Sequence, residues 1–281
     1  MTGTLPRPRK RFGQNFLTDR NVLMRIVTAA GILPGEPVLE IGPGRGALTR
    51  LLAVSAGRVV AVEVDRDLVA HLSAEFGGEP RVEIVDSDIL ECDLVALLAR
   101  RHPGRWRVVA NLPYNISSQV LFLLLDHIGL FSGLTLMLQK EVAERIASGP
   151  EEKEYGILSV FCRLHCDVDL AFTVKPGSFT PAPKVHSAIL QLRPLPAPRF
   201  DVGEEAFFRR LVKAAFGNRR KTLWNCLKGQ FATDDHYLRR VLDACGIDPG
   251  RRGETLSLEE FANLSRALQA FVITPPGLPL N

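Results

Sequence analysis

Short apolar runs alternate with amphipathic segments between residues 37 and 147. The apolar runs predict five buried strands, at residues 38–41, 58–64, 82–85, 107–110 and 134–138. The amphipathic segments predict helices, at residues 47–54, 66–75, 94–101, 117–127 and 140–147. Strands that are apolar throughout and are separated by helices are typical of a parallel sheet with both faces covered. The pattern therefore predicts an α/β fold.

The pattern changes after Lys175, where prolines become frequent. An alternating segment at 185–192 predicts one more strand, and the proline-rich segment 193–198 predicts a stiff linker. Beyond residue 200 the remaining signals are helical, at residues 204–216, 236–245 and 258–271. Ser257, followed three residues later by Glu260, predicts a capping box for the last helix. The C-terminal part is therefore expected to be all-helical.

The length and composition fit a large domain followed by a small one. The chain has 281 residues, of which 46% are hydrophobic and 23% are charged, as in ordinary globular proteins. We expect an α/β domain with a basic N-terminal segment over residues 1–198 and a small all-α domain over residues 199–281.

The sequence argues against a membrane protein and against a disulfide-framed one. The longest apolar run, Val120–Leu125, is far too short to span a bilayer. No apolar segment follows the basic N-terminus, so a signal peptide is not expected. Five cysteines without regular spacing favour a reducing compartment. We expect a cytoplasmic monomer.

The net charge of +4 does not by itself indicate a nucleic-acid partner, but the positions of the basic residues do. They cluster at residues 7–11 and along the expected amphipathic helix 207–221, which we interpret as an RNA-binding face rather than a solvated one. Arginines outnumber lysines 27 to 8, which suits bidentate phosphate contacts, although a GC-rich genome would produce the same bias.

A glycine-rich loop, Gly42-Pro43-Gly44-Arg45-Gly46, lies at the first predicted strand-to-helix turn. Glycines there let a ligand approach the backbone closely. With Ala47 the loop also fits the dinucleotide-binding pattern, and Glu63 follows Gly42 at the distance expected of a ribose-binding acid. The loop alone therefore fits a nicotinamide-dependent dehydrogenase and an S-adenosylmethionine-dependent enzyme equally well.

Four polar or glycine positions, Gly42, Glu63, Asp88 and Asn111, end successive predicted strands. The carboxyl ends of parallel strands line one edge of an open sheet, which is where ligands bind. One carboxylate there can hold both ribose hydroxyls of a cofactor, and the next can accept from its adenine amine. A single carboxylate would more often cap a helix, but four convergent positions predict a cleft.

The tetrapeptide Asn111-Leu112-Pro113-Tyr114 follows the fourth predicted strand. The amino group of adenine is a poor nucleophile because its lone pair is delocalised into the ring. An Asn oxygen and a backbone carbonyl can both accept from that group and turn it toward a reactive geometry. Proline adds no competing N–H, and a tyrosine face can stack on an extruded base. The alternative is an ordinary strand end followed by a proline turn.

His165, together with Cys162 and Cys166, raises the question of a metal site. The four-residue spacing places both cysteines on one side of an apolar helix, and no second cluster completes a set of four ligands. We therefore expect a packed helix face and no metal.

Short motifs lie at residues 11–17, 40–44, 111–117, 138–142, 155–156 and 179–185, and together they cover nearly all of residues 11–192. No single motif is specific, but their order and spacing are. By them the chain resembles the KsgA family of ribosomal RNA adenine N6,N6-dimethyltransferases, which modify two adjacent adenosines near the 3′ end of small-subunit (16S) rRNA.

The resemblance implies a Rossmann-like class I methyltransferase domain, with a mostly parallel seven-stranded sheet, and S-adenosyl-L-methionine as cofactor. The implied partner is small-subunit rRNA within a (pre-)30S ribosomal particle, and the implied role is in ribosome biogenesis. The implied cofactor contacts are Asn15, Leu17, Gly42, Glu63, Asp88 and Asn111. The target amine is expected at Asn111 and the Leu112 carbonyl. Tyr114 and Phe179 are expected on the two faces of the base.

Three other functions fit part of the sequence. An Erm-type methyltransferase of large-subunit rRNA shares the fold and the Asn-(Leu/Ile)-Pro-Tyr core, but residues 155–156 and 179–185 favour the small-subunit enzyme. A non-catalytic assembly or transcription factor on the same scaffold would not need the full set of site residues. A dehydrogenase leaves residues 111–114 without a role.

Overall fold

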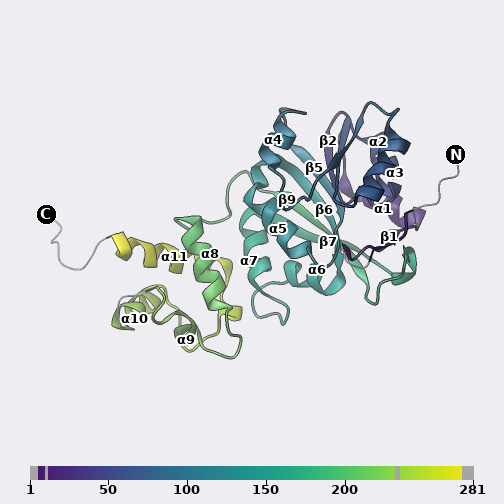
Figure 1. The fold of residues 1–281 in the computed structure, drawn as a ribbon. Helices are drawn as coiled ribbons and strands as arrows, with labels where there is room; N and C mark the ends of the chain where they lie inside the picture. The colour runs from purple at the N-terminus through teal and green to yellow at the C-terminus, as the bar shows by residue number, and fades with distance from the viewer. Residues whose placement is uncertain (1–5, 10–11, 232–234, 274–281) are drawn as a thin grey trace. The chain divides into compact units, whose positions relative to one another are not determined.

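The computed structural model describes residues 6–9, 12–231 and 235–273 (Figure 1). Seven strands form one sheet in the order β4-β3-β2-β5-β6-β9-β7. Their bounds are β2 (Pro37–Ile41), β3 (Arg58–Glu63), β4 (Val82–Asp86), β5 (Trp106–Asn111), β6 (Phe131–Gln139), β7 (Cys166–Val174) and β9 (Ser187–Pro194). The strands from β4 to β6 pair in parallel, whereas β9 runs antiparallel to β6. The predicted, mostly parallel sheet is confirmed.

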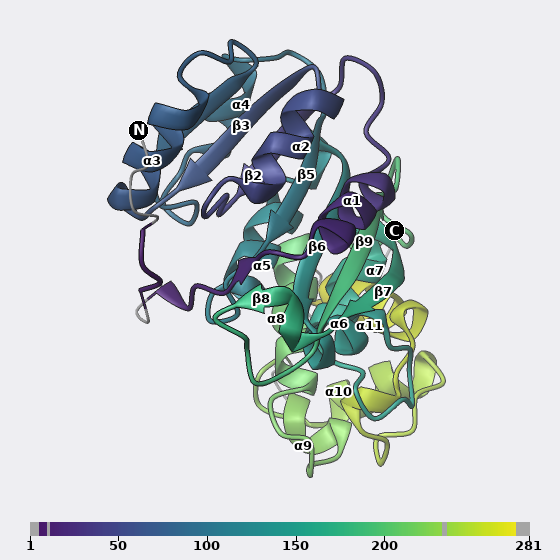
Figure 2. The same ribbon diagram turned by 90° about the vertical axis from the view of Figure 1, so that its right-hand side faces the viewer.

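Helices cover both faces of this sheet. Figures 1 and 2 show α1 and α2 on one face and α5 on the other. Along the chain as far as residue 165, whichever compact unit they belong to, the helices are α1 (Arg20–Ala30), α2 (Ala47–Ser55), α3 (Arg66–Phe76), α4 (Leu94–Ala99), α5 (Ser117–Asp126), α6 (Lys140–Ala147) and α7 (Ile157–His165). The face under α1 and α2 carries a buried apolar cluster. Its members include Leu23, Ile26, Val38, Leu48, Leu52, Val59, Val109, Met137 and Ile189.

Local sequence signals explain where the helices nearest the cleft begin and end. Asp19 caps α1 by accepting hydrogen bonds from the backbone N–H groups of Asn21 and Val22. Asp65 caps α3 in the same way through the N–H of Asp67. The first residue after α1, Gly31, adopts a left-handed conformation with φ of 57°, which favours glycine.

Two pieces of β structure lie outside the predicted elements. The short strands β1 (Phe16–Leu17) and β8 (Phe179–Thr180) pair as an antiparallel ribbon. The second, longer piece is β7. The expectation that Cys162 and Cys166 share a helix is wrong, because α7 ends at His165 and Cys166 begins β7. Since β7 lies at the sheet edge and is mostly exposed, it lacks the apolar run of a central strand.

The chain divides into two compact units. The first takes in the chain as far as Ala143 together with Asp167–Pro194, and it contains the seven-stranded sheet. The second consists of Glu144–Cys166 and the chain from Leu195 onward. Short 3₁₀ helices are η2 (Ile128–Leu130), η3 (Pro176–Ser178) and η4 (Gly253–Thr255).

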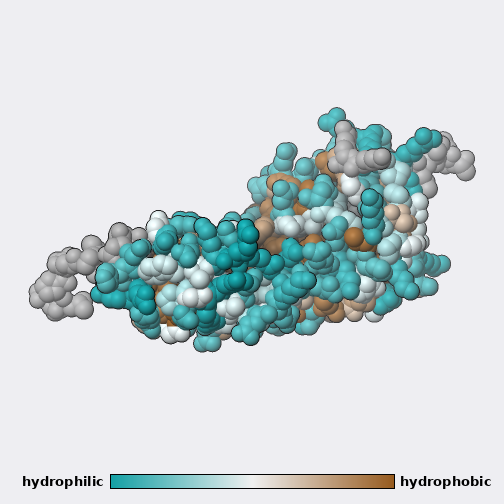
Figure 3. Space-filling view, turned by 90° about the horizontal axis from the view of Figure 1, so that it is seen from below, coloured by the Kyte–Doolittle hydropathy of each residue, from teal (hydrophilic) through white to brown (hydrophobic). Residues whose placement is uncertain are grey.

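The second unit is built from helices around aromatic side chains. Its helices after residue 200 are α8 (Glu205–Ala215), α9 (Leu223–Leu227), α10 (Asp235–Ala244) and α11 (Leu258–Ile273). The rings of Phe216 and Phe261 stack with their centroids 5.9 Å apart. The capping box is confirmed, because Ser257 Oγ accepts from the Glu260 N–H and the Glu260 carboxylate accepts from the Ser257 N–H. Hydrophilic residues cover most of this unit on the face in Figure 3.

The expected basic helix over residues 207–221 is too long by about two turns. Helix α8 ends at Ala215, and its basic residues Arg209, Arg210 and Lys213 are helical, whereas Arg219 and Lys221 follow in a turn. Arg219 pairs with Glu254 at 3.2 Å. The basic residues between 207 and 221 therefore do not form one continuous helical face.

Candidate active site at the carboxyl edge of the sheet

The cleft lies where the strand order of the first unit reverses. From β2 the chain proceeds outward to β3 and β4, and it then returns to place β5 on the other side of β2. Ile41 pairs with Val62 of β3 and with Ala110 of β5, so the next residue of each strand lies at the same level. Ligands bind at such a reversal in open α/β sheets.

Eight of the nine expected site residues line this one cleft. They are Asn15, Leu17, Gly42, Glu63, Asp88, Asn111, Leu112 and Tyr114. They come from the N-terminal segment and from the ends of β2, β3, β4 and β5. The structure therefore brings together residues that the sequence spreads over a hundred positions.

The glycine loop after β2 needs glycine at two positions for steric reasons. Gly44 has φ of 60°, and a Cβ there would lie 3.0 Å from the ring of Phe16. Gly46, the residue before α2, has φ of 75°, and a Cβ there would lie 2.9 Å from the ring of Phe76. A side chain at either position would be strained and would push an aromatic ring. The loop can therefore keep its backbone open to the cleft.

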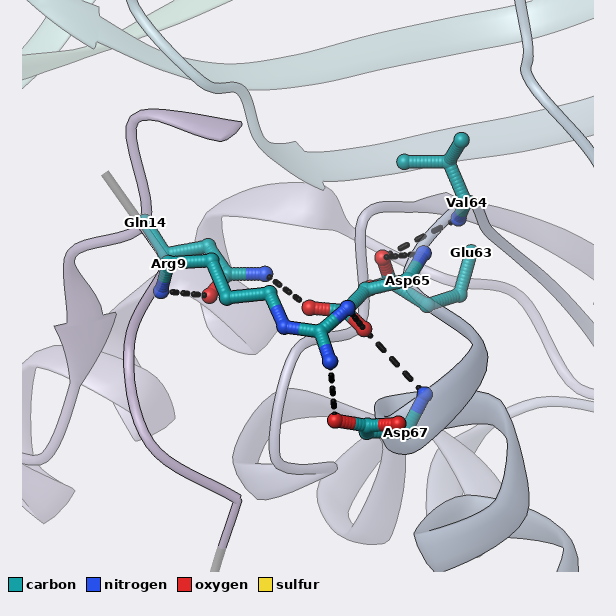
Figure 4. Close-up of polar contacts among 6 residues, drawn as sticks. All are labelled: Arg9, Gln14, Glu63, Val64, Asp65 and Asp67. Atoms are coloured by element: carbon teal, nitrogen blue, oxygen red, sulfur yellow. Dashed lines mark hydrogen bonds and ion pairs between the residues drawn. The ribbon is translucent and has the colours of Figure 1, made fainter. Parts of the chain in front are cut away.

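Glu63, the last residue of β3, uses its carboxylate to hold backbone N–H groups. Oε1 accepts from the N–H groups of Val64 and Asp65, each at 3.0 Å (Figure 4). Oε2 accepts from the N–H of Gly44 at 3.1 Å. The residue is only 5% exposed. Burial raises the pKa of the Glu63 carboxyl, and these hydrogen bonds oppose that effect.

Asp65 ties the N-terminal segment to the same strand end. Its carboxylate, 1% exposed, accepts from Arg9 Nη1 and from Gln14 Nε2, each at 3.0 Å (Figure 4). Arg9 also pairs with the exposed Asp67, and its backbone N–H donates to Gln14 Oε1 at 2.7 Å. These contacts hold the segment whose residues 12–17 line the cleft.

Asp88 lies two residues beyond the end of β4 rather than at it. Its Oδ1 accepts from the N–H of Leu90 at 2.9 Å, which shapes the turn. The carboxylate still lines the cleft, whereas Asp86, the last residue of β4, is exposed and does not. Asp88 therefore reaches the cleft from the turn that follows β4 and not from the strand itself.

The Asn111–Tyr114 segment is held at three points that leave acceptors open. Asn111 Nδ2 donates to the carbonyl of Asn15 at 3.3 Å, and the Leu112 N–H donates to the carbonyl of Met137 at 3.2 Å. The Tyr114 hydroxyl lies 2.6 Å from Ser187 Oγ. No residue that the structure describes donates to Asn111 Oδ1 or to the Leu112 carbonyl. These two oxygens can therefore accept from a ligand amine.

Phe179 is the expected site residue that does not line the cleft. It pairs with Leu17 across the β1–β8 ribbon, is 4% exposed, and belongs to the apolar cluster under α1. Its contact with a substrate base stays a prediction.

Glu40 is a cleft residue to which the sequence assigned no role. It is 1% exposed and lines the cleft, and its Oε2 has no hydrogen-bond partner among the described residues. Burial, with the nearby Glu63 carboxylate as a smaller cause, raises the pKa of Glu40 to about 8; the neighbouring Thr49 hydroxyl opposes this. An acidic residue inside an otherwise apolar strand was the signal that could have identified it.

His165 contacts an acid. Its Nε2 lies 3.2 Å from Glu205 Oε1. This contact with His165, together with Arg209, lowers the pKa of Glu205 to about 2. The described part of the chain holds no group of three or more His, Cys, Asp or Glu side chains suited to a metal ion. Within the same residues, no helix is long and apolar enough to cross a membrane.

Residues 6–269 match the family model of the ribosomal RNA adenine dimethylases. The chain is 57% identical to ribosomal RNA small subunit methyltransferase A of Geobacter metallireducens, over 96% of this chain and 98% of the relative. It is 51% identical to the protein of that name from Syntrophotalea carbinolica, over 94% of this chain and 97% of the relative.

Two solved structures share the fold across nearly the whole chain. A dimethyladenosine transferase from Plasmodium falciparum aligns with a TM-score of 0.77 and 26% identity, over 91% of this chain and 98% of the other. The 23S rRNA methyltransferase ErmE aligns with a TM-score of 0.69 and 27% identity, over 91% of this chain and 100% of the other. Both matches confirm the expected fold class.

Proposed function

The chain belongs to the ribosomal RNA adenine dimethylase family, and we propose that it dimethylates N6 of two adjacent adenosines near the 3′ end of small-subunit rRNA, with S-adenosyl-L-methionine as donor. It is an rRNA adenine dimethyltransferase. The observation that carries the proposed chemistry is the pair of acceptors without a described donor, Asn111 Oδ1 and the Leu112 carbonyl, in a cleft at the sheet's reversal point.

The cleft residues fit the proposed cofactor. The Glu63 carboxylate can accept about four hydrogen bonds, and three backbone N–H groups already donate to it. One position is therefore left for a ribose hydroxyl. The buried Glu40 oxygen without a described partner suits a cationic ligand. In the proposed arrangement Gly42 lies under the methionine part, Asp88 accepts from the cofactor's adenine, and the other contacts come from Asn15, Leu17 and Asn111. When bound, the cofactor supplies a methyl group attached to a sulfonium. The sulfonium sulfur is already an activated leaving group.

The target amine is held by acceptors alone. Asn111 Oδ1 and the Leu112 carbonyl accept from the NH₂ group, which frees its lone pair and stabilises the positive charge that develops on nitrogen. The rest of the rate enhancement comes from positioning in line with the methyl group. No general base is required, because the alkylated aminopurine cation is acidic enough to lose its proton to water.

The base itself is proposed to stack on Tyr114. The half-buried phenol has a pKa raised by burial, so it is neutral at physiological pH. Phe179 is proposed for the other face of the base. In the structure this side chain is 4% exposed.

The small subunit is favoured over the large one by the closeness of the relatives. The proteins whose names specify the small subunit are 57% and 51% identical to this chain, whereas ErmE is 27% identical. We propose that residues 1–198 bind the cofactor and that residues 199–281 contact a (pre-)30S particle. The protein is proposed to act as a monomer in the cytoplasm, where that particle is assembled.

Primer extension on rRNA from a strain that lacks the gene tests this function. Dimethylated adenine cannot form a Watson–Crick pair, so wild-type rRNA blocks the polymerase. We expect the block at two adjacent small-subunit adenosines to disappear, and to return with the wild-type gene but not with Asn111→Ala. Loss of a block in large-subunit rRNA instead would indicate the Erm-type activity. Calorimetry that detects no cofactor binding would indicate a non-catalytic factor.

A further inference from the structure

Ser187 is a fully buried serine whose hydroxyl contacts the hydroxyl of Tyr114, the residue proposed to stack on the target base. It is 0% exposed, and its Oγ lies 2.6 Å from the Tyr114 hydroxyl. The two residues are 73 positions apart in the chain. None of the proposed contacts to cofactor or base involves Ser187, so the hydrogen bond needs its own explanation.

The sheet fixes the position of Ser187 relative to the cleft. Ser187 is the first residue of β9 and pairs with Gln139, the last residue of β6. The preceding residue, His186, accepts a hydrogen bond from the Lys140 N–H at 2.9 Å. Because β6 lies between β5 and β9, the Tyr114–Ser187 contact spans the strand that separates them. A rigid sheet therefore holds the serine, while Tyr114 projects from the loop after β5.

Tyr114 is consequently held at both of its ends. The Ser117 hydroxyl donates to the Tyr114 backbone carbonyl at 3.1 Å, and Ser187 holds the phenol. A tyrosine side chain has two rotatable torsions, χ1 and χ2. The phenol oxygen lies on the χ2 axis, so a partner at that oxygen fixes χ1 and with it the direction in which the ring extends. A stacked base needs the ring at one fixed place, because offset stacking depends on where the two rings lie relative to each other. The serine thus restricts the motion that would otherwise weaken a stack.

We propose that Ser187 is a positioning residue for methyl transfer, which fixes the place of the Tyr114 ring so that the target adenine stacks with its amine at Asn111 and Leu112. This role rests on the proposed stacking by Tyr114. Ser187 acts only through the phenol and touches neither cofactor nor base. Its loss should therefore lower kcat, while the affinities for the cofactor and for the ribosomal particle stay the same.

A double-mutant cycle tests the inference. Ser187→Ala and Tyr114→Phe each remove one partner of the same hydrogen bond and keep the aromatic ring. We expect each to lower kcat for dimethylation of unmodified small subunits by roughly three- to tenfold, the effect of one net hydrogen bond. The double variant should be no slower than the single ones, because the bond is already lost. KM for the particle and the cofactor Kd should stay at wild-type values.

Two controls separate positioning from general damage. Ser265→Ala removes another fully buried serine, which donates to the Val202 carbonyl in the second unit, and it should leave kcat unchanged. If Ser187→Ala does not fold, Tyr114→Phe still breaks the bond from the half-buried side.

Two results would overturn the inference: wild-type kcat in both single variants, or a double variant whose loss is the product of the single losses. Tyr114→Ala distinguishes this failure from failure of the stacking role itself. If Tyr114→Ala is inactive while Ser187→Ala and Tyr114→Phe are fully active, only the role of Ser187 is wrong. If Tyr114→Ala is fully active, the proposed stacking is wrong as well.

Discussion

Glu63 and Gly44 are joined by a hydrogen bond of 3.1 Å from the Gly44 backbone N–H to Glu63 Oε2. The acid at the end of β3 therefore shapes the glycine loop at the end of β2. Its other oxygen holds two N–H groups of its own loop. The residue expected to bind a ribose is thus also the residue that shapes the floor of the cleft.

Glu63→Gln should weaken cofactor binding by roughly tenfold or more. An amide nitrogen cannot accept, so the variant side chain cannot hold three backbone N–H groups and a ribose hydroxyl together. A lost hydrogen bond to a charged group costs about 1.5–3 kcal/mol. Calorimetric titration with S-adenosylmethionine measures the effect. Asp86→Asn is the matched control, because Asp86 pairs in register with Glu63 but is exposed and outside the cleft. Equal affinities for Glu63→Gln and wild type would contradict the role of this carboxylate.

Asn111→Ala should lower kcat for methyl transfer by roughly a hundredfold or more, since removal of one preorganised electrostatic partner of a transition state has this effect. The affinity for the cofactor should fall less, because the lost Nδ2 contact to the Asn15 carbonyl is one of several holding the N-terminal segment. Single-turnover kinetics with labelled cofactor separates the two. Asn225→Ala, an exposed asparagine in α9, should behave as wild type. Normal single-turnover rates for Asn111→Ala would rule out the amine clamp.

Asp65→Asn should loosen the N-terminal segment over the cleft. The buried carboxylate binds both Arg9 and Gln14, and hydrogen bonds to charged groups are worth about 1.5–3 kcal/mol. We expect faster hydrogen exchange at residues 12–17 and a cofactor Kd raised roughly tenfold. Asp67→Asn removes only the exposed partner of Arg9, so its effect should be much smaller. Unchanged exchange in Asp65→Asn would show that the segment is held by other contacts.

Glu40 should make the cofactor-free protein less stable as the pH rises. Its folded-state pKa of about 8 lies above the ordinary value of 4.5, so its contribution is fully present below about pH 4.5 and is lost as the pH rises toward 8. Denaturant unfolding between pH 5 and pH 8 measures this trend. Glu40→Gln, which mimics the protonated side chain, should flatten that part of the curve. The same slope in both proteins would assign the pH dependence to other groups.

The central sheet could be predicted because its strands are apolar on both faces. Strands β2, β3, β5 and β6 are mostly buried, so the sequence shows an apolar run at each of them. The edge strand β4 is only partly buried but keeps the apolar residues Val82, Ile84 and Val85. The edge strand β7 alternates Asp167 and Asp169 with less polar residues and shows no such run. The β1–β8 ribbon has only two residues per strand, which is too short for any periodicity. Exposure and length therefore separate the predicted elements from the missed ones.

The cleft residues that end strands could be predicted because a parallel sheet places all its carboxyl ends at one edge. The supporting contacts could not. Arg9 and Asp65 are 56 positions apart, and Tyr114 and Ser187 are 73 apart, so only the folded chain brings them together. Phe179 was expected from the family motif alone, and its burial in the β1–β8 ribbon depends on a pairing that no local pattern reveals.

Whether this chain dimethylates small-subunit rRNA is decided by mass spectrometry. Small and large subunits from a strain that lacks the modification are incubated with the protein and methyl-labelled S-adenosylmethionine, and the rRNA of each is digested and sequenced by mass. We predict labelled dimethyladenosine at two adjacent positions near the 3′ end of the small-subunit rRNA. Absence of dimethyladenosine there, or label confined to large-subunit rRNA, would contradict the proposed function.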